Sequence, residues 1–542
     1  MSATTKFVEA RIEEVDSRLG AANFLRRNAK KVFPDHWSFL LGEIALYCFI
    51  IEILTGIFLA FFFEPSLTEV TYHGSYAKLQ GEEISAAYAS TLNITFDIRG
   101  GLLMRQMHHW AALVFVAAIL LHLLRIFFTG AFRRPRETNW IIGIIMLVLT
   151  MIEAFIGYGM PDDLLSGIGL RITQGIILSV PVIGTWASFL VFGGEFPGTE
   201  FVARFFIAHV LILPGILLAL VTAHLMILWH QKHTQFPGKG KTEHNVVGPR
   251  FFPYYMTKQG AFFMFTFGVL ALLGGFAQIN PVWLYGPYTP ANVTAGAQAD
   301  FYMGVLEGAV RLMPGGIEMV VFGHTLAWNI IIPALILPGV ILTFFGLYPF
   351  LEAWATGDKS HHHLLDRPRN VPTRTAFGAF WITVYGVIWA AGGNDIFAFA
   401  FDVSLQATTW ILRAAFLFLP FIAFFVTRRI CLGLQRKDQE IVEHGFETGM
   451  IYRHADGSFT ESHEPLPEDP RALLTSKPKI RRIEASGWAE NGVPPPFGVI
   501  GQIQAKANHL YTDDDVDVAP ENGHRGRDEQ QERQEITQSG SE

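Results

Sequence analysis

Four histidines stand at closely matched intervals inside two long apolar segments. His108 and His122 are fourteen residues apart in "RQMHHWAALVFVAAILLHLLRIFFTG", and His209 and His224 are fifteen apart in "RFFIAHVLILPGILLALVTAHLMILWH". On an α-helix, fourteen or fifteen residues return to nearly the same face, about 21 Å further along the axis. Imidazole is a common metal ligand and an axial ligand of haem iron. Two such helices facing each other would therefore form two stacked bis-histidine sites, each suited to a six-coordinate haem.

Proton relays are the alternative use of histidines within apolar segments. A relay has no need of two equal intervals, whereas two stacked haems do, so the spacing favours haem. Glycines support this interpretation, because a flat macrocycle between helices needs places where the backbone approaches closely. Two pairs of glycines repeat the fourteen-residue interval: Gly42 with Gly56 and Gly143 with Gly157. We expect a four-helix bundle that encloses two b-type haems.

Arginines accompany these histidines near the ends of the apolar segments. Arg105 precedes His108 by three residues, Arg125 follows His122 by three, and Arg204 precedes His209 by five. Haem propionates are anions, and guanidinium groups are suitable partners for them. Ordinary interfacial anchoring is the alternative, above all for Arg125, which also fits the distribution of positive charge described below.

The elements that must position these residues are membrane-spanning helices. The chain of 542 residues is 50% hydrophobic and only 16% charged, where soluble domains have about 25% charged residues. It contains no CxxCH haem-attachment motif, and its two cysteines cannot form a disulfide framework or hold an iron–sulfur cluster. Eight apolar stretches predict an all-α membrane protein with eight transmembrane helices, over residues 38–63, 103–128, 139–160, 205–229, 260–277, 319–347, 376–392 and 407–427.

Lys and Arg residues alternate between the loops and predict the orientation. Loops on one side hold seven, four, five and four of them (1–37, 125–138, 230–258 and 352–374), and loops on the other side hold two, one, one and none (64–102, 161–203, 278–318 and 393–406). Both termini are therefore expected in the cytoplasm, without a cleavable signal peptide. The long outer segments should fold as short helices and loops.

Composition divides the chain into four expected parts. These are a cytoplasmic N-terminal segment (1–37), the haem-binding four-helix bundle (38–230), a C-terminal transmembrane domain (231–430) and a polar cytoplasmic extension (431–542). The last stretch, "PENGHRGRDEQQERQEITQSGSE", is rich in Gln, Glu and Gly and is expected to be disordered.

Several motifs together resemble the cytochrome b subunit of quinol–cytochrome c oxidoreductases, the cytochrome bc complexes. The likeness covers roughly residues 30–430. It includes "WSFLLGEIALYCFIIEILTGIFLAFFF" in the first span, both histidine-bearing segments, "GYGMPDDLLSGIGLRITQGIILSVPVIG" and "RFFPYY". All eight spans in one chain, a polar tail, and the "PDD" and "DFY" variations are most similar to the actinobacterial version.

The resemblance implies that His108 and His209 bind an outer haem and that His122 and His224 bind an inner one. It also implies menaquinol as substrate, with an iron–sulfur (Rieske-type) subunit and a c-type cytochrome as partners. A haem–copper terminal oxidase in a supercomplex and a homodimer of the complex are expected in the same way. No nucleic-acid partner is expected.

The family oxidises quinol near the outer haem with a "PEWY" motif, and the matching segment here is "ADFYMGVLEGAVR". Asp300 replaces the glutamate with a side chain one methylene shorter, and Ala299 replaces the proline. A carboxylate in hydrogen-bond reach could accept a quinol proton. The resemblance therefore implies catalytic roles for Asp300, Tyr302 and Glu307 and a pocket formed by Tyr158 and Gly169, although an exposed loop carboxylate is the alternative for Asp300 and Glu307.

The inner quinone site is less defined by the sequence. His230 is the nearest match to the histidine that the family uses there, displaced by one residue, and solvated interfacial residues are the alternative reading for each candidate. The other candidates are His233, Asp35, His36 and the Lys258–Gln259 pair. Glu52 and Glu153 are carboxyl groups within spans that could carry protons. The segment "SHHHLLD" (360–366) is expected to be a solvated loop rather than a metal site.

These features predict a subunit that oxidises quinol at the outer side and passes electrons through two haems toward a quinone near the cytoplasm, coupled to proton translocation across the cell membrane. A proton-coupled transporter with histidine relays, and a haem-b membrane anchor of a dehydrogenase, are the alternatives.

Overall fold

A computed structural model describes residues 11, 13–18, 20–292, 298, 300–478, 480–483 and 498–512. Ala299 and the expected disordered stretch, residues 520–542, lie outside these residues. Within them, the eight predicted spans are confirmed as eight helices long and apolar enough to cross a membrane: Trp37–Ala60, Gly101–Phe128, Glu137–Gly159, Phe201–Gln231, Phe251–Phe276, Trp328–Thr356, Pro372–Gly392 and Leu405–His444.

Several spans are built from more than one helical segment. The first joins η1 and α3, the fourth joins α9, η3 and α10, the fifth joins η4 and α11, and the sixth joins α14, η5 and α15. Their bounds are η1 Trp37–Phe39, α3 Leu40–Ala60, α5 Gly101–Phe128, α6 Glu137–Gly159, α9 Phe201–Ile207, η3 Ala208–Ile212, α10 Leu213–Gln231, η4 Phe251–Tyr255, α11 Met256–Phe276, α14 Trp328–Ile331, η5 Ile332–Ile336, α15 Leu337–Thr356, α16 Pro372–Gly392 and α18 Leu405–His444.

The sixth span differs from the predicted stretch at its start. Residues 318–327 form an antiparallel hairpin of β3 (Glu318–Val321) and β4 (His324–Ala327), and the helix begins only at Trp328. The expected start at residue 319 was wrong because most of the hairpin residues are apolar, and hydropathy alone does not distinguish a strand from a helix. The eighth helix, α18, also continues past the apolar stretch, so residue 430 lies inside it.

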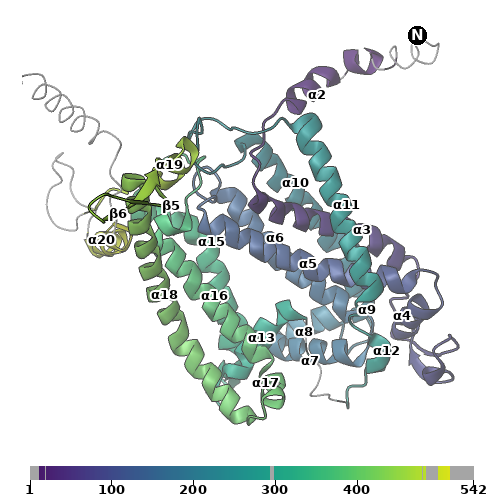
Figure 1. Cartoon of the computed structure of the whole chain (residues 1–542). Helices are drawn as coiled ribbons and strands as arrows, with labels where there is room; N and C mark the ends of the chain where they lie inside the picture. Colours follow the sequence, from purple (N-terminus) through teal and green to yellow (C-terminus); the bar gives the residue numbers. More distant parts are fainter. Residues whose placement is uncertain are drawn as a thin grey trace, which may run out of the picture.

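The remaining elements lie at the two ends of the helical bundle (Figure 1). At one end are β1 Glu69–Thr71, η2 Ala77–Leu79, β2 Glu83–Ser85, α4 Ala86–Phe96, α7 Leu164–Leu178, α8 Gly184–Phe192, α12 Val282–Tyr285, α13 Phe301–Leu312 and α17 Asn394–Ala400. At the other are α2 Ala21–Ala29, η6 Pro368–Asn370, β5 Phe446–Arg453, β6 Phe459–Glu464, α19 Glu468–Thr475 and α20 Gly498–Thr512. The first set forms the predicted outer end and the second the predicted cytoplasmic end.

Two groups of spans pack side by side. Helix α3 packs against α5, α6 against α10, and α11 against α5, while α16 packs against α18 and α13. The core of the first group contains Cys48, Ile51, Ala111, Phe115 and Leu217, all fully or nearly fully buried. Because Ala111 and Phe115 lie between His108 and His122 in the sequence, this apolar layer separates the two histidine levels.

A π-helical turn explains why the two histidine intervals differ by one residue. Residues Ala208–Ile212 form this turn, and Pro214 follows at the start of α10. Proline has no N–H to donate, which favours local rearrangement of the hydrogen bonds. A π-turn holds one more residue than an α-turn. The fifteen residues from His209 to His224 therefore cover nearly the same rotation and rise as fourteen residues of regular α-helix.

Candidate functional site

His108 and His209 face each other near the predicted outer end. Their ring centres are 6.1 Å apart and their planes are inclined at 76°. An imidazole nitrogen binds a transition metal at about 2.0 Å, so one metal between two imidazoles holds their ring centres roughly 6 Å apart. The observed separation therefore fits two imidazoles that would bind one metal between them.

Hydrogen bonds fix the orientation of both rings. The Thr55 hydroxyl donates to the Ile51 carbonyl at 2.7 Å, so its oxygen accepts from Nδ1 of His108 at 2.9 Å. Nδ1 of His209 lies 3.1 Å from the Glu153 carbonyl oxygen and 3.0 Å from its carboxylate. Metal-binding histidines are commonly held in this way through the nitrogen that does not bind the metal. Nε2 of each ring is left as the ligand atom.

The second histidine pair lies nearer the predicted cytoplasmic end. Nδ1 of His122 is buried and has no hydrogen-bond partner among the residues that the structure covers. His122 is close enough to His224 for the two rings to interact electrostatically. The ring of His224 lies against the backbone of Asn139. Within the described residues no three metal-ligating side chains converge. The histidine pairs therefore suit a metal that brings its other ligands in a cofactor.

Three of the four predicted glycines lie directly on a histidine. A Cβ atom on Gly42 would lie 2.9 Å from Cε1 of His122, and one on Gly56 would lie 3.2 Å from Cε1 of His108. A Cβ on Gly157 would be 2.8 Å from Nε2 of His209, whereas one on Gly143 would have no atom within 4 Å. The first three positions allow the helix backbone to approach a histidine ring, and Gly143 lies beside open space.

Two of the predicted arginines have buried nitrogen atoms without partners. Arg105 donates to the Asn280 carbonyl at 3.1 Å, but its Nε and Nη2 atoms have no partner within the described part of the chain. Arg125 lies over the Phe39 ring at 4.5 Å, and its Nη2 is unpaired. Unpaired buried guanidinium nitrogens fit an anionic group such as a propionate. Arg204 is exposed and donates to the Leu190 carbonyl at 2.6 Å.

A cavity of about 270 Å³ opens at the predicted outer end between α6, α7 and α13. It brings together the five residues that the sequence assigned to a quinol pocket: Tyr158, Gly169, Asp300, Tyr302 and Glu307. Its other walls are largely apolar, formed by Phe155, Leu165, Ile168, Ile172, Ile176, Met303, Leu306 and Val310. An apolar cavity with a few polar groups suits a ring with polar substituents.

The two carboxylates in this cavity have different partners. Asp300 contacts Nε2 of His109 at 3.3 Å, and the Tyr302 hydroxyl donates to its other oxygen at 3.4 Å. Glu307 forms an ion pair with Arg311, which also binds Asp395 at 2.8 Å. Burial and the neighbouring carboxylate of Asp300 raise the pKa of Tyr302 well above its usual value. Either carboxylate could accept a proton. The Glu307 carboxylate is held more firmly than that of Asp300, because it forms an ion pair with Arg311.

Asp163 is a residue that the sequence analysis did not assign to the site. It is fully buried and caps α7, accepting hydrogen bonds from the backbone N–H groups of Leu165 at 3.0 Å and Ser166 at 3.2 Å. Burial raises the pKa of its carboxyl to about 6. An Asp before an apolar run is an N-cap signal that could have identified it. The cap positions the helix that carries Gly169.

The candidates for the inner quinone site are only partly brought together. Asp35 and Lys258 form an ion pair, and Gln259 follows Lys258 on α11. His230 is exposed at the end of α10. Burial lowers the pKa of His233 to about 4.

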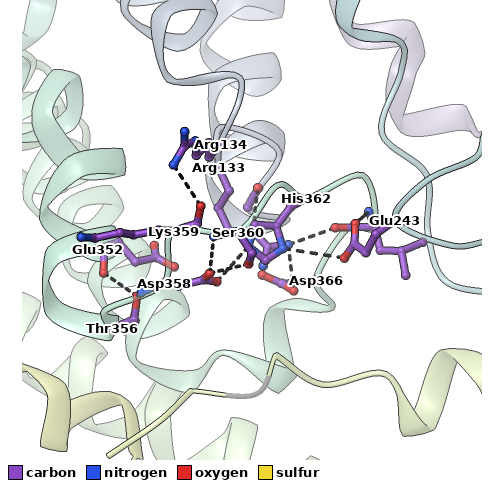
Figure 2. Close-up of polar contacts among 12 residues, drawn as sticks. Arg133, Arg134, Glu243, Glu352, Thr356, Asp358, Lys359, Ser360, His362 and Asp366 are labelled. Carbon is purple, nitrogen blue, oxygen red and sulfur yellow. Dashed lines mark hydrogen bonds and ion pairs between the residues drawn. The ribbon is translucent and has the colours of Figure 1, made fainter. Parts of the chain in front are cut away.

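Residues 362–366 are packed rather than solvated, which corrects the expectation for that part of the "SHHHLLD" segment, whereas Ser360 and His361 are exposed. The His362 side chain is only 14% exposed and lies 2.8 Å from Asp358 and 3.7 Å from Glu243 (Figure 2). Asp358 and Glu243 raise the pKa of His362 against the opposing effect of burial. Glu243 lies in the loop that follows α10, far from His362 in the sequence. The sequence around His362 therefore gave no sign of the contact that holds this loop.

Comparisons with known proteins agree with this geometry. A family model described as "Cytochrome b(N-terminal)/b6/petB" matches residues 113–287. The "Cytochrome bc1 complex cytochrome b subunit" of Streptomyces coelicolor is 52% identical, covering 92% of this chain and 91% of that protein. The protein of the same description from Mycobacterium tuberculosis is 53% identical, covering 84% and 82%. A solved structure, "Hyperthermophilic respiratory Complex III", has a TM-score of 0.59 over 78% of this chain and 100% of that chain at 23% identity, which supports the fold.

The fold, the facing histidines and these matches define the class of protein, a multi-pass membrane cytochrome of the b type. More particularly, the chain belongs to the family of cytochrome b subunits of the cytochrome bc1 complex. It is thus a subunit of a respiratory quinol–cytochrome c oxidoreductase, and haem b is the cofactor that its family implies.

Proposed function

We propose that this chain is a dihaem cytochrome b that oxidises menaquinol at the outer side and reduces a quinone near the cytoplasm, with proton translocation. The observation that carries the proposal is the arrangement of His108 and His209, whose ring centres are 6.1 Å apart while the Nδ1 atom of each ring is held by a hydrogen-bond partner, which leaves Nε2 as the ligand atom. The cavity with Asp300 lies beside this pair, because Asp300 contacts His109, the residue next to His108.

The chain's own residues would hold the haems at two levels. His108 and His209 would hold one and His122 and His224 the other, with Arg105 and Arg125 as propionate partners; Arg204 is a weaker candidate because it is exposed. Bound haem supplies one-electron transfer, and two ligating histidines leave no open iron position, which suits electron transfer rather than oxygen binding.

Proton removal from quinol would fall to the cavity carboxylates. We propose that Asp300 accepts a proton from the substrate hydroxyl, with Tyr302 and His109 orienting the carboxylate. Glu307 is the second candidate, held by Arg311. Tyr158 and Gly169 would bound the ring of the substrate.

Orientation and partners are part of the same proposal. The distribution of Lys and Arg supports cytoplasmic termini in the cell membrane. Both cysteines are free and lie in different spans, so an iron–sulfur cluster would have to come from a Rieske-type partner. A c-type cytochrome subunit, a dimer of the complex and association with a haem–copper oxidase complete the proposal.

Replacing one outer ligand tests the proposal. His209→Leu in the assembled complex should remove one of two haem b groups, measured from the dithionite-reduced spectrum, while the subunit still inserts. His361→Leu, at an exposed histidine in a loop, is the control and should retain both. If the wild-type subunit had no b-type haem spectrum, the alternative of a transporter with histidine relays would be favoured. If the wild-type complex had no quinol–cytochrome c activity, the alternative of a haem-b anchor of a dehydrogenase would be favoured.

A further inference from the structure

A polar cluster lies between the first and fifth spans at the predicted cytoplasmic end. Oε1 of Glu43 accepts hydrogen bonds from the Tyr255 hydroxyl at 2.6 Å and from Nε2 of Gln259 at 2.8 Å. The Tyr47 hydroxyl donates to Oε1 of Gln259 at 2.5 Å. Glu43 follows Gly42, the residue that lies on the ring of His122. The cluster is therefore adjacent to the inner histidine level.

The second oxygen of this carboxyl group has no partner. Oε2 of Glu43 is buried and makes no hydrogen bond to any residue that the structure describes. A buried polar atom without a partner is unfavourable, so a ligand that accepts a hydrogen bond from the protonated Oε2, or donates one to the ionised Oε2, would remove this cost. The structure thus contains a carboxyl group in which one oxygen is held by two hydrogen bonds and the other is buried and unpaired.

Two charged residues, Asp35 and Lys258, lie near the cluster and are partly exposed to water. Lys258 and Asp35 both interact electrostatically with Glu43. They form an ion pair whose side chains are 38% and 39% exposed. Tyr47 and Tyr255 are the other titratable groups that face Glu43. Among these neighbours of Glu43, Asp35 and Lys258 form the pair whose partial exposure to water is established.

Glu43 differs from the other members of the cluster in its ability to act as an acid. The amide of Gln259 can orient a neighbour but cannot act as an acid, and tyrosine hydroxyls are weak acids with a pKa near 10. The Lys258 ammonium is engaged by Asp35. Glu43 is therefore the group of this cluster best suited to deliver a proton to a buried acceptor.

We propose that Glu43 donates a proton to a quinone bound at this end of the bundle, oriented by Gln259 and Tyr255. The inference rests on the proposed function, in which quinol oxidised at the outer cavity supplies the electrons. A quinone takes up two electrons and two protons to become a quinol. Glu43 gives one proton to a carbonyl oxygen, where an O–H bond forms as the carboxyl O–H bond breaks. Water at the Asp35–Lys258 face supplies the second proton and then reprotonates Glu43.

The test uses the whole complex with its haem b reduced, mixed rapidly with a short-chain menaquinone while haem absorbance is followed. Glu43→Gln, which keeps the shape of the side chain, should slow the quinone-dependent re-oxidation of haem b about 100-fold with haem content unchanged. Glu43→Gln combined with Gln259→Glu moves the carboxyl group across one hydrogen bond and should restore the rate. Glu440→Gln, at an exposed position of α18, is the matched control and should leave it unchanged.

Infrared difference spectra provide a second measurement that does not depend on turnover. Addition of the quinone should change a carboxyl C=O band in the wild-type complex, and the change should be absent in Glu43→Gln. Wild-type re-oxidation in Glu43→Gln, no rescue by the double variant, or an infrared change that persists in Glu43→Gln would overturn the inference. A wild-type complex whose haem b is not reduced by quinol would instead refute the proposed function.

Discussion

Gly157→Ala is the perturbation for which the structure makes the sharpest prediction. The new Cβ would lie 2.8 Å from Nε2 and 2.9 Å from Nδ1 of His209. Ordinary contact begins at 3.4 Å, and because Cε1 of the ring is closer still than Nε2, the ring would have to move by more than 0.6 Å. It cannot move freely, because Nδ1 is held by the carbonyl and carboxylate of Glu153 at 3.1 and 3.0 Å.

Two free-energy costs follow from this displacement. Overpacking in a close-packed core costs about 1–3 kcal/mol, and loss of the hydrogen bond from His209 adds about 0.5–1.5 kcal/mol. Together these correspond to roughly a tenfold or greater loss of affinity for a ligand shared by His108 and His209. We expect the haem b content of purified Gly157→Ala to fall from two toward one per chain.

Gly143→Ala is the matched control on the same helix. It lies fourteen residues from Gly157, and its Cβ would meet no atom within 4 Å. Its haem content and thermal stability should equal those of the wild type. Equal haem loss in the two variants, or full haem retention in Gly157→Ala, would refute the reasoning that these glycines act through contact with a histidine.

Three further predictions concern the residues that support the site. Asp163→Ala should destabilise α7 locally by about 0.5–2 kcal/mol. Hydrogen exchange of α7 should become faster and quinol binding weaker. Unchanged exchange would contradict the capping role of Asp163. Arg105→Met should weaken haem retention without changing membrane insertion, because its unpaired nitrogens would no longer meet an anion. Protonated His362 should hold the loop of residues 357–366: its pKa is raised above the usual 6.5, so this stabilisation is complete below pH 6.5 and is lost as the pH rises through the raised value. After correction for intrinsic rates, hydrogen exchange of the loop should therefore increase with alkaline pH in the wild type and in the control His361→Gln. It should not increase in His362→Gln. An identical response in all three proteins would exclude this role of His362.

Local patterns explain how much of the molecule could be predicted. A span is set by the thickness of the hydrocarbon layer, so an apolar run of about twenty residues identifies a helix wherever it packs. The interval between His108 and His122 is also local, because helical rotation and rise are fixed. The hairpin of residues 318–327 was the exception, since its apolar residues gave no sign of the pairing between its two strands.

The candidate site depended more on packing. Tyr158, Gly169 and Asp300 come from three helices, and no local pattern states that they share one cavity. Arg105 and Arg204 each precede an outer histidine, by three and five residues, yet of these two only Arg105 has unpaired buried nitrogens, because Arg204 is exposed and donates to the carbonyl of Leu190.

The sequence by itself determined the eight spans, the family resemblance and the two levels of histidines, because hydrophobicity and helical periodicity act between near neighbours. Only the tertiary structure decided which glycines lie on histidines, that a π-turn compensates for the extra residue before His224, and that the carboxylate of Glu43 meets Gln259. These features depend on contacts between helices far apart in the chain, and such contacts are set by the packing of whole helices against one another.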